Sequence, residues 1–374
     1  MTKTNLKLMI PGPVQPEDAV LHAMGGPVQP HYGPAFRDYY YETTGLLKKV
    51  FNTGGDVFLL VGSGSSAIDA CIGSLVASGK KMIIGINGFF GLRMKEIAES
   101  YNIEVLPVSA EWGKPIDPRD IDAALRKNAD VSAVALVHLE TSTTIINPVQ
   151  EIGSVTRKHG VPFVLDAVSS LGGVPVDMDE WGIDLCSSAT QKCLGAPPGL
   201  APVAVSESGW AAIERNPHPG HGWYLNLNIW KRYAQDWVDW HPFPITMATN
   251  NFFALKTSLE SLLEEGIEVR LERYRKLAMR LRQGLRRIGM LPFTPDELMA
   301  PVLTCAYGPE GVPTGEIVQF MADKYSIKIA GGLGEQLKDK VFRIGHMAPT
   351  VSEVDIDEVV DALASFKSDW KIAE

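Results

Sequence analysis

The chain has 374 residues, of which 45% are apolar and 21% are charged, close to the values of an average soluble globular protein. Lysine and arginine number 35 and the acidic residues 44, so the formal net charge is −9. A protein that binds nucleic acid or an anionic membrane needs a basic face, so this balance argues against both partners. A small anionic ligand needs only a local positive site and remains possible.

Nothing in the sequence predicts export, membrane insertion or a metal site. Residues 1–9 contain no apolar stretch of signal-peptide length, and the longest apolar runs, such as 131–137, have the length of a strand. The cysteines lie far apart without a C-x-x-C pair, which favours buried free thiols in a reducing compartment. We therefore expect a cytoplasmic protein. The four cysteines are Cys71, Cys186, Cys193 and Cys305.

Short β-branched runs alternate with amphipathic stretches through the first two-thirds of the chain. Strands that are apolar almost throughout are usually buried on both faces of a parallel sheet that helices cover. We therefore predict an α/β fold with a mainly parallel, seven-stranded sheet in a large domain. The predicted strands are 56–61, 81–85, 103–108, 131–137, 161–166, 184–188 and 201–205, with helices at 65–78, 91–101, 118–127 and 149–159.

The pattern changes after about residue 250, where two long helices are followed by short strands and helices. This predicts a smaller C-terminal α+β domain, and the division is an N-terminal arm at 1–12, a large domain at 13–262 and a small domain at 263–374. Residues 216–244 are predicted to form a long loop at a functional site or an interface. The later elements are predicted at 252–265, 268–288, 302–306, 315–325, 327–330, 341–344 and 354–366.

Four segments carry residues suited to chemistry, although each has an ordinary structural explanation. Ser63-Gly64-Ser65 follows a strand and opens a helix, so its backbone N–H groups can bind phosphate or simply form a tight turn. Asp166 ends a buried strand, where open α/β sheets place their ligands, but it can equally cap a helix. Lys192 stands among small and apolar residues that would lower its pKa, or it snorkels from the sheet edge. Arg343, within an apolar strand, is either structural or a carboxylate clamp.

Together these residues meet the requirements of one cofactor. Pyridoxal phosphate needs a lysine for its Schiff base and an acidic partner for its pyridine nitrogen. It also needs a phosphate site, and an amino-acid substrate adds the need for a carboxylate clamp.

The same residues carry a resemblance to the class V aminotransferases of the pyridoxal-phosphate fold type I, most of all to the alanine–glyoxylate and serine–glyoxylate group. The resemblance runs essentially from end to end, and the segments around Asp166 and Lys192 are its most specific parts. The matching segments are Pro11-Gly12-Pro13, Gly62-Ser63-Gly64-Ser65, Asn87-Gly88-Phe89-Phe90-Gly91, Leu165-Asp166-Ala167-Val168-Ser169-Ser170, Gln191-Lys192-Cys193-Leu194-Gly195, Gly331-Gly332-Leu333-Gly334 and Arg343-Ile344-Gly345.

The resemblance implies a role for each site residue. Lys192 would hold pyridoxal phosphate as a Schiff base and act as general acid and base, while Asp166 would pair with the pyridinium nitrogen. Phe90, smaller than the tryptophan of many relatives, would stack on one face of the ring and Val168 on the other. Thr141 would hydrogen-bond the O3′ side of the cofactor. Phosphate would be bound by Ser63, Gly64, Ser65 and Gln191, and the substrate carboxylate by Arg343 and backbone near Gly12.

The resemblance also implies a homodimer with active sites at the interface, because Thr246 would reach the phosphate of the partner subunit. In some relatives a tyrosine three positions earlier does the same, and Phe243 stands there in this chain. That difference predicts a weaker phosphate contact between subunits or another group in its place.

We therefore expect a ping-pong aminotransferase that moves an amino group from alanine or serine to glyoxylate or another small 2-oxo acid. A pyridoxamine–pyruvate transaminase is the main alternative, but such enzymes carry an acidic residue in the phosphate site, where this chain has Ser63-Gly64-Ser65. A lyase or cysteine desulfurase of the same fold is disfavoured because Cys193 and Cys305 lie in packed motifs. Retention of Lys192, Asp166 and Arg343 argues against a non-catalytic interaction subunit.

Overall fold

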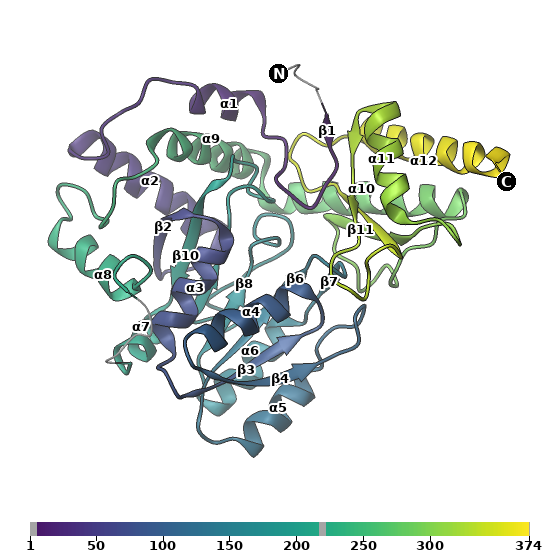
Figure 1. The fold of residues 1–374 in the computed structure, drawn as a ribbon. Coiled ribbons are helices and arrows are strands. Elements are labelled where there is room, and N and C mark those ends of the chain that lie inside the picture. Colours follow the sequence, from purple (N-terminus) through teal and green to yellow (C-terminus); the bar gives the residue numbers. More distant parts are fainter. Residues whose placement is uncertain (1–5, 217–221, 374) are drawn as a thin grey trace.

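The computed structural model describes residues 6–216 and 222–373 and consists of a large α/β lobe and a smaller lobe beside it (Figure 1). The long helix α10 (Ile267–Arg287) runs from the large lobe into the small one. In the described part of the chain, no helix combines the length and the apolar composition that are needed to cross a membrane.

The large lobe is built on a seven-stranded sheet in the order β2-β10-β9-β8-β5-β3-β4. Only β10 runs against its neighbours, so the other strands share one direction and their carboxyl ends meet at one edge. The prediction of a mainly parallel, seven-stranded sheet is confirmed. The strands are β2 (Asp56–Gly62), β3 (Lys81–Ile86), β4 (Glu104–Ser109), β5 (Val131–Val137), β8 (Phe163–Asp166), β9 (Leu185–Ser187) and β10 (Gly199–Val205).

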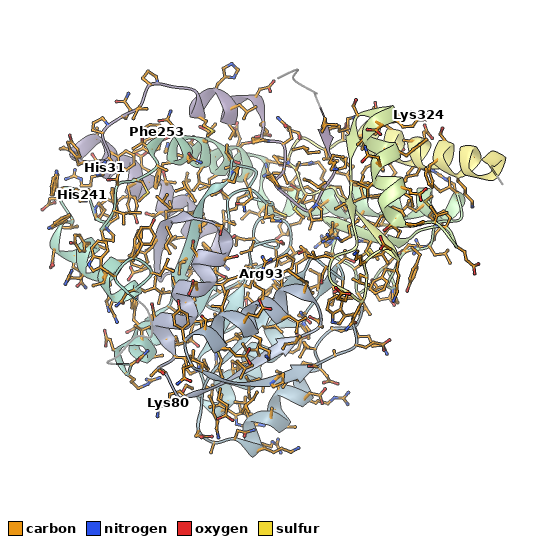
Figure 2. The ribbon with its side chains drawn as sticks, in the orientation of Figure 1. His31, Lys80, Arg93, His241, Phe253 and Lys324 are labelled. Atoms are coloured by element: carbon orange, nitrogen blue, oxygen red, sulfur yellow. The ribbon has the colours of Figure 1, made fainter. Side chains whose placement is uncertain are left out.

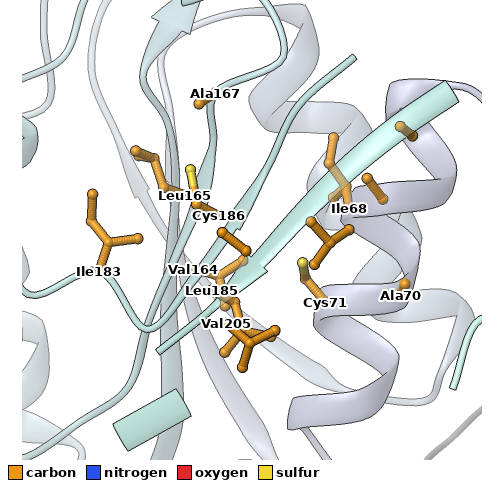
Figure 3. Packing of buried hydrophobic residues seen from close by; sticks show 14 of the residues in the cluster. Ile68, Ala70, Cys71, Val164, Leu165, Ala167, Ile183, Leu185, Cys186 and Val205 are labelled. Carbon is orange, nitrogen blue, oxygen red and sulfur yellow. The ribbon is translucent and has the colours of Figure 1, made fainter. Parts of the chain in front are cut away.

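Helices pack on this sheet because their apolar faces and the buried strands exclude water together. Figure 3 shows part of that packing, with Ile68 and Cys71 of α3 close to Cys186 and Leu185 of the sheet. All four cysteines fall within the described residues, are buried and form no disulfide. The helices of the large lobe are α1 (Asp18–Met24), α2 (Pro34–Phe51), α3 (Gly64–Leu75), α4 (Phe89–Ser100), α5 (Pro118–Lys127), α6 (Val149–His159), α7 (Glu207–Glu214), α8 (Leu227–Asp236) and α9 (Thr249–Glu265).

The small lobe has its own hydrophobic cluster, formed mainly by residues between 274 and 366. Its three-stranded sheet has the order β11-β14-β13, and the N-terminal strand β1 pairs in parallel with β12. We propose that the domain boundaries follow this separation of clusters, with an arm at 1–12. The elements are β1 (Lys7–Leu8), β11 (Leu303–Tyr307), α11 (Thr314–Tyr325), β12 (Ile327–Lys328), β13 (Ala330–Gly331), β14 (Val341–Gly345) and α12 (Glu353–Ala373), and a two-stranded sheet pairs β6 (Leu139–Glu140) with β7 (Ile145–Ile146).

Two local predictions differ from the structure. The stretch 216–244, predicted to be a loop, contains helix α8, because Asn226 caps its first turn by accepting a hydrogen bond from the Asn228 amide at 3.0 Å and its Leu227 and Trp230 are buried. Residues 217–221 of that stretch lie outside the described part of the chain. The single strand predicted at 327–330 is split into β12 and β13, which pair with different partners.

Candidate active site

A cavity of about 350 Å³ opens at the carboxyl edge of the large sheet and gathers most of the predicted site residues. Its walls come from the ends of β2, β3, β5, β8 and β9 and the segments that follow them, which is where ligands bind in open α/β sheets. The lining residues are Ser63, Gly64, Ser65, Ile68, Phe90, Arg93, Val137, Leu139, Thr141, Asp166, Val168, Ser169, Gln191 and Lys192.

The Ser63-Gly64-Ser65 segment lies at the start of α3. Ser63 is the N-cap residue in extended conformation, and the first N–H groups of a helix have no partner within it. A Cβ on Gly64 would lie 2.6 Å from Cγ2 of Val168, so only glycine permits the helix to approach the opposite wall this closely. This end of the cavity therefore offers backbone donors and the positive end of a helix dipole to an anion.

Asp166 ends β8 and is almost fully buried. Burial raises the pKa of its carboxyl group to about 7, whereas the hydrogen bond that it accepts from the Val168 amide at 2.8 Å lowers it. A buried carboxylate of this kind favours a cationic or protonated partner.

Lys192 follows β9 and places its side chain in the same cavity. Burial lowers the pKa of its amine to about 8, so an appreciable fraction is neutral near physiological pH. Its Nζ donates a hydrogen bond to the carbonyl of Pro11. The next residue, Gly12, has φ +98°, and a Cβ there would lie 2.7 Å from Lys192 Nζ. The N-terminal segment is therefore in direct contact with the lysine side chain.

Phe90 and Val168 both line the cavity, as predicted for residues on opposite faces of a flat ligand. Phe90 lies in the first turn of α4, and the guanidinium of Arg93 lies one turn later, 5.0 Å from the Phe90 ring centroid. Figure 2 shows Arg93 near the middle of the molecule. Sequence reasoning missed this arginine, although its place one helical turn after Phe90 was a usable signal.

Arg343 lies in β14 of the small lobe and is almost entirely buried. Its Nε donates to the Gly331 carbonyl and its Nη1 to the Thr141 carbonyl, each at 3.0 Å. Since Thr141 lines the cavity, these bonds fix the arginine directly behind the cavity wall. Burial lowers the pKa of the guanidinium, which nonetheless remains charged at neutral pH.

Two positions named for contacts between subunits lie away from this cavity. Thr246 is exposed in the segment between α8 and α9. Phe243 is fully buried and packs against Phe36, 6.0 Å away between ring centroids. It is therefore a core residue of this chain.

A fold of this kind, with a half-buried lysine and a buried aspartate at the carboxyl edge of its sheet, defines a class of enzyme, and comparison with known proteins identifies that class. The family model for class V aminotransferases matches residues 22–357. The chain belongs to the class V aminotransferase family, whose members use pyridoxal phosphate.

Three similar sequences illustrate the range of names in this family. An uncharacterized aminotransferase of Methanocaldococcus jannaschii is 39% identical and covers 91% of this chain and 87% of its own length. The small subunit of a soluble hydrogenase of Synechococcus is 35% identical, over 95% and 91%. The (S)-ureidoglycine–glyoxylate transaminase of Bacillus subtilis is 33% identical, over 91% and 85%.

Solved structures of the same family superpose closely. The alanine–glyoxylate aminotransferase of Nostoc has a TM-score of 0.92 at 31% identity and covers 96% of this chain and 94% of its own. The pyridoxamine–pyruvate aminotransferase of Mesorhizobium loti has a TM-score of 0.91 at 28% identity, over 97% and 92%. This chain is therefore an aminotransferase with the family's fold.

Proposed function

We propose that this aminotransferase moves the amino group of a small amino acid, alanine or serine, to glyoxylate or another small 2-oxo acid by a ping-pong mechanism. The observation that carries the proposal is the cavity in which Lys192, Asp166 and the start of α3 meet, with Arg343 hydrogen-bonded to its wall. The similarity to glyoxylate-dependent transaminases supports the choice of acceptor.

The residues present fit pyridoxal phosphate. Gln191 lies in the cavity wall, and its buried Oε1 atom, an acceptor, has no hydrogen-bond partner among the described residues. It is the NH₂ group of the same side chain that can donate to a phosphate oxygen. Gly64 leaves room that a side chain would fill, next to the free N–H groups of a helix N-terminus. We assign phosphate binding to Ser63, Gly64, Ser65 and Gln191, ring contacts to Phe90 and Val168, and the O3′ side to Thr141.

Pyridoxal phosphate supplies an aldehyde that takes up amino groups and a ring that withdraws electrons. In our proposal Asp166 holds the proton of the ring nitrogen, because a buried carboxylate stabilises an adjacent cation. Lys192 is the group that takes a proton from the substrate carbon and returns it. A pKa of about 8 suits both transfers, since neither protonation state is strongly favoured near neutral pH.

We assign the substrate carboxylate to Arg343, with backbone near Gly12 beside Lys192. Its two bonds to backbone carbonyls hold the planar guanidinium in one orientation, which suits bidentate recognition of a carboxylate. A homodimer in which Thr246 contacts the partner's phosphate site, and a cytoplasmic location, complete the proposal.

A pyridoxamine–pyruvate transaminase is the second candidate, and the close superposition with such an enzyme favours it. Against it stands the composition of the cavity, because Asp166 is the one acidic residue among the described residues that line it. Among the described residues, the cavity wall around Ser63-Gly64-Ser65 therefore has no carboxylate that would repel phosphate.

The deciding experiment is a panel of amino donors with glyoxylate and pyruvate as acceptors, followed through the absorbance of the bound cofactor. We expect alanine or serine to be used with glyoxylate. Rapid formation of pyridoxal from pyridoxamine and pyruvate, without added pyridoxal phosphate, would identify the second candidate. A protein that shows no cofactor absorbance after addition of pyridoxal phosphate would favour an interaction subunit; the Synechococcus relative is named as the small subunit of a hydrogenase.

A further inference from the structure

Glu140, the last residue of β6, is a completely buried acid that the proposed reaction does not use. One oxygen of its carboxylate accepts hydrogen bonds from the backbone amides of Phe90 at 3.0 Å and Gly91 at 3.1 Å. The other oxygen accepts from the amide of Ser142 at 3.0 Å and from its hydroxyl at 2.5 Å.

The four donors around this carboxyl group favour its ionised form. Three of the four partners are backbone N–H groups, which can only donate. The fourth, the Ser142 hydroxyl, donates its hydrogen to Glu140 and accepts a bond from the Phe89 amide at 2.9 Å. Burial, the larger effect, raises the pKa of Glu140 above its ordinary value, and these four donors offset part of that rise.

The bonds join two segments that build the cavity. Phe90 and Gly91 belong to the first turn of α4, whereas Ser142 belongs to the loop that carries Thr141. The approach is so close that a Cβ on Gly88 would lie 2.4 Å from Cδ of Glu140 and 2.4 Å from Oγ of Ser142. Glu140 also lies at the N-terminus of the helix, where a negative charge is favourable.

We propose that Glu140 is a positioning residue for the aminotransferase reaction. It holds the first turn of α4 on the 140–144 loop, so that the Phe90 ring and Thr141 meet the cofactor in one fixed arrangement. This inference rests on the proposed function of the same cavity, and it adds a residue to which the sequence patterns gave no role.

The charge of Glu140 also acts on the site. The charged and titratable groups that it influences or that share the cavity are Asp166 on β8, Arg343 on β14, Arg93 on α4 and Lys192 after β9. It opposes ionisation of Asp166 and favours the charged form of Arg343. Removing it therefore makes the cavity more positive.

The experiment compares two variants with a matched control. Glu140→Gln keeps the size of the side chain but removes its charge. Its NH₂ group cannot accept hydrogen bonds, so the donors on one side of the former carboxylate lose their acceptor. Ser142→Ala removes the hydroxyl contact and keeps the charge. Glu264→Gln, at an exposed position of α9, is the control.

Three properties are measured for each variant and for the unmodified protein. They are the hydrogen–deuterium exchange of residues 88–94 without cofactor, the Kd for pyridoxal phosphate, and the pH at the midpoint of the absorbance change of the Lys192-bound cofactor. We expect both variants to exchange faster at 88–94 and to bind about tenfold more weakly, which corresponds to the loss of one or two hydrogen bonds. Only Glu140→Gln should move the midpoint, by about one pH unit to lower pH, because a lost negative charge disfavours the protonated form.

The inference is overturned if Glu140→Gln matches the control in all three measurements, or if exchange rises equally along the whole chain. If Glu140→Gln speeds exchange at 88–94 but leaves the pH midpoint unchanged, the proposed effect of the Glu140 charge is overturned and its positioning role stands. If the unmodified protein binds no pyridoxal phosphate, the proposed function fails, while exchange at 88–94 still tests the contact itself.

Discussion

Burial acts in opposite directions on the two groups at the centre of the site. Asp166 and Lys192 are both withdrawn from water, which disfavours their charges and brings the pKa of the acid up to about 7 and that of the amine down to about 8. Each favours the charged form of the other. Burying these two groups therefore lowers the stability of the cofactor-free protein, and a cation bound beside Asp166 can offset part of that loss.

Asp166→Asn should make the cofactor-free protein more stable, and more so at higher pH. Because folding raises this pKa from 3.8 to about 7, the contribution of Asp166 to stability is present below pH 3.8 and is lost as the pH rises through 7. We expect the gain in unfolding free energy to grow by about 2 kcal/mol between about pH 5.5 and about pH 8. Urea unfolding at both values measures it, and a gain independent of pH would contradict the burial argument.

Arg343→Ala should raise the KM for the acid substrates by about 100-fold, the range expected for losing a charge-assisted pair. Arg343→Lys should recover little, because one ammonium cannot span the carbonyls of Gly331 and Thr141 and also present a flat fork. Steady-state kinetics with glyoxylate measures both. An unchanged KM in the alanine variant would remove Arg343 from the site.

At the scale of elements, the site is made where segments from different parts of the chain touch. The start of α3, the start of α4, the 140–144 loop and the N-terminal segment around Gly12 come together at one sheet edge. Glycines at these junctions permit approaches that no other residue would.

Gly12→Ala should abolish tight binding of pyridoxal phosphate. The added Cβ would lie 2.6 Å from Cδ of Lys192, in a backbone with φ +98° that alanine disfavours. Gly33→Ala is the matched control, since Gly33 has φ +89° but nothing within 4 Å of its Cβ position. Titration with the cofactor measures Kd, and equal losses in the two variants would assign the effect to backbone strain alone.

The periodic elements were readable from the sequence because buried strands and amphipathic helices repeat locally. Strand 131–137 and helices 118–127 and 149–159 were predicted with the observed bounds. Helix α8 was missed because aromatic, proline and histidine residues around it resemble a loop, and its burial depends on contacts with the large lobe.

At the scale of the whole molecule, the proposed dimer can be tested by mixing subunits. Lys192→Ala and Thr246→Ala should each lower the activity of a homodimer in which both subunits carry the substitution. A mixed dimer should regain one complete site, in which an intact Lys192 receives Thr246 from the other subunit. Coexpression with two affinity tags and kinetics of the purified mixed species measure this recovery. If the mixture is no more active than its parents, Thr246 acts within its own subunit or not at all.

The sequence by itself determined the α/β class, the parallel sheet and the residues of greatest chemical interest, because strand periodicity and the Asp166 and Lys192 motifs are local patterns. Only the tertiary structure decided which of these residues share a cavity and which other groups join them. Glu140 carries no pattern of its own, since its role depends on the backbone amides that folding brings beside it. The spacing of Arg93 from Phe90 is a local signal, but its place in the cavity is set by the fold. Burial likewise exists only in the folded chain, and it is burial that brings the pKa values of Asp166 and Lys192 close to neutrality.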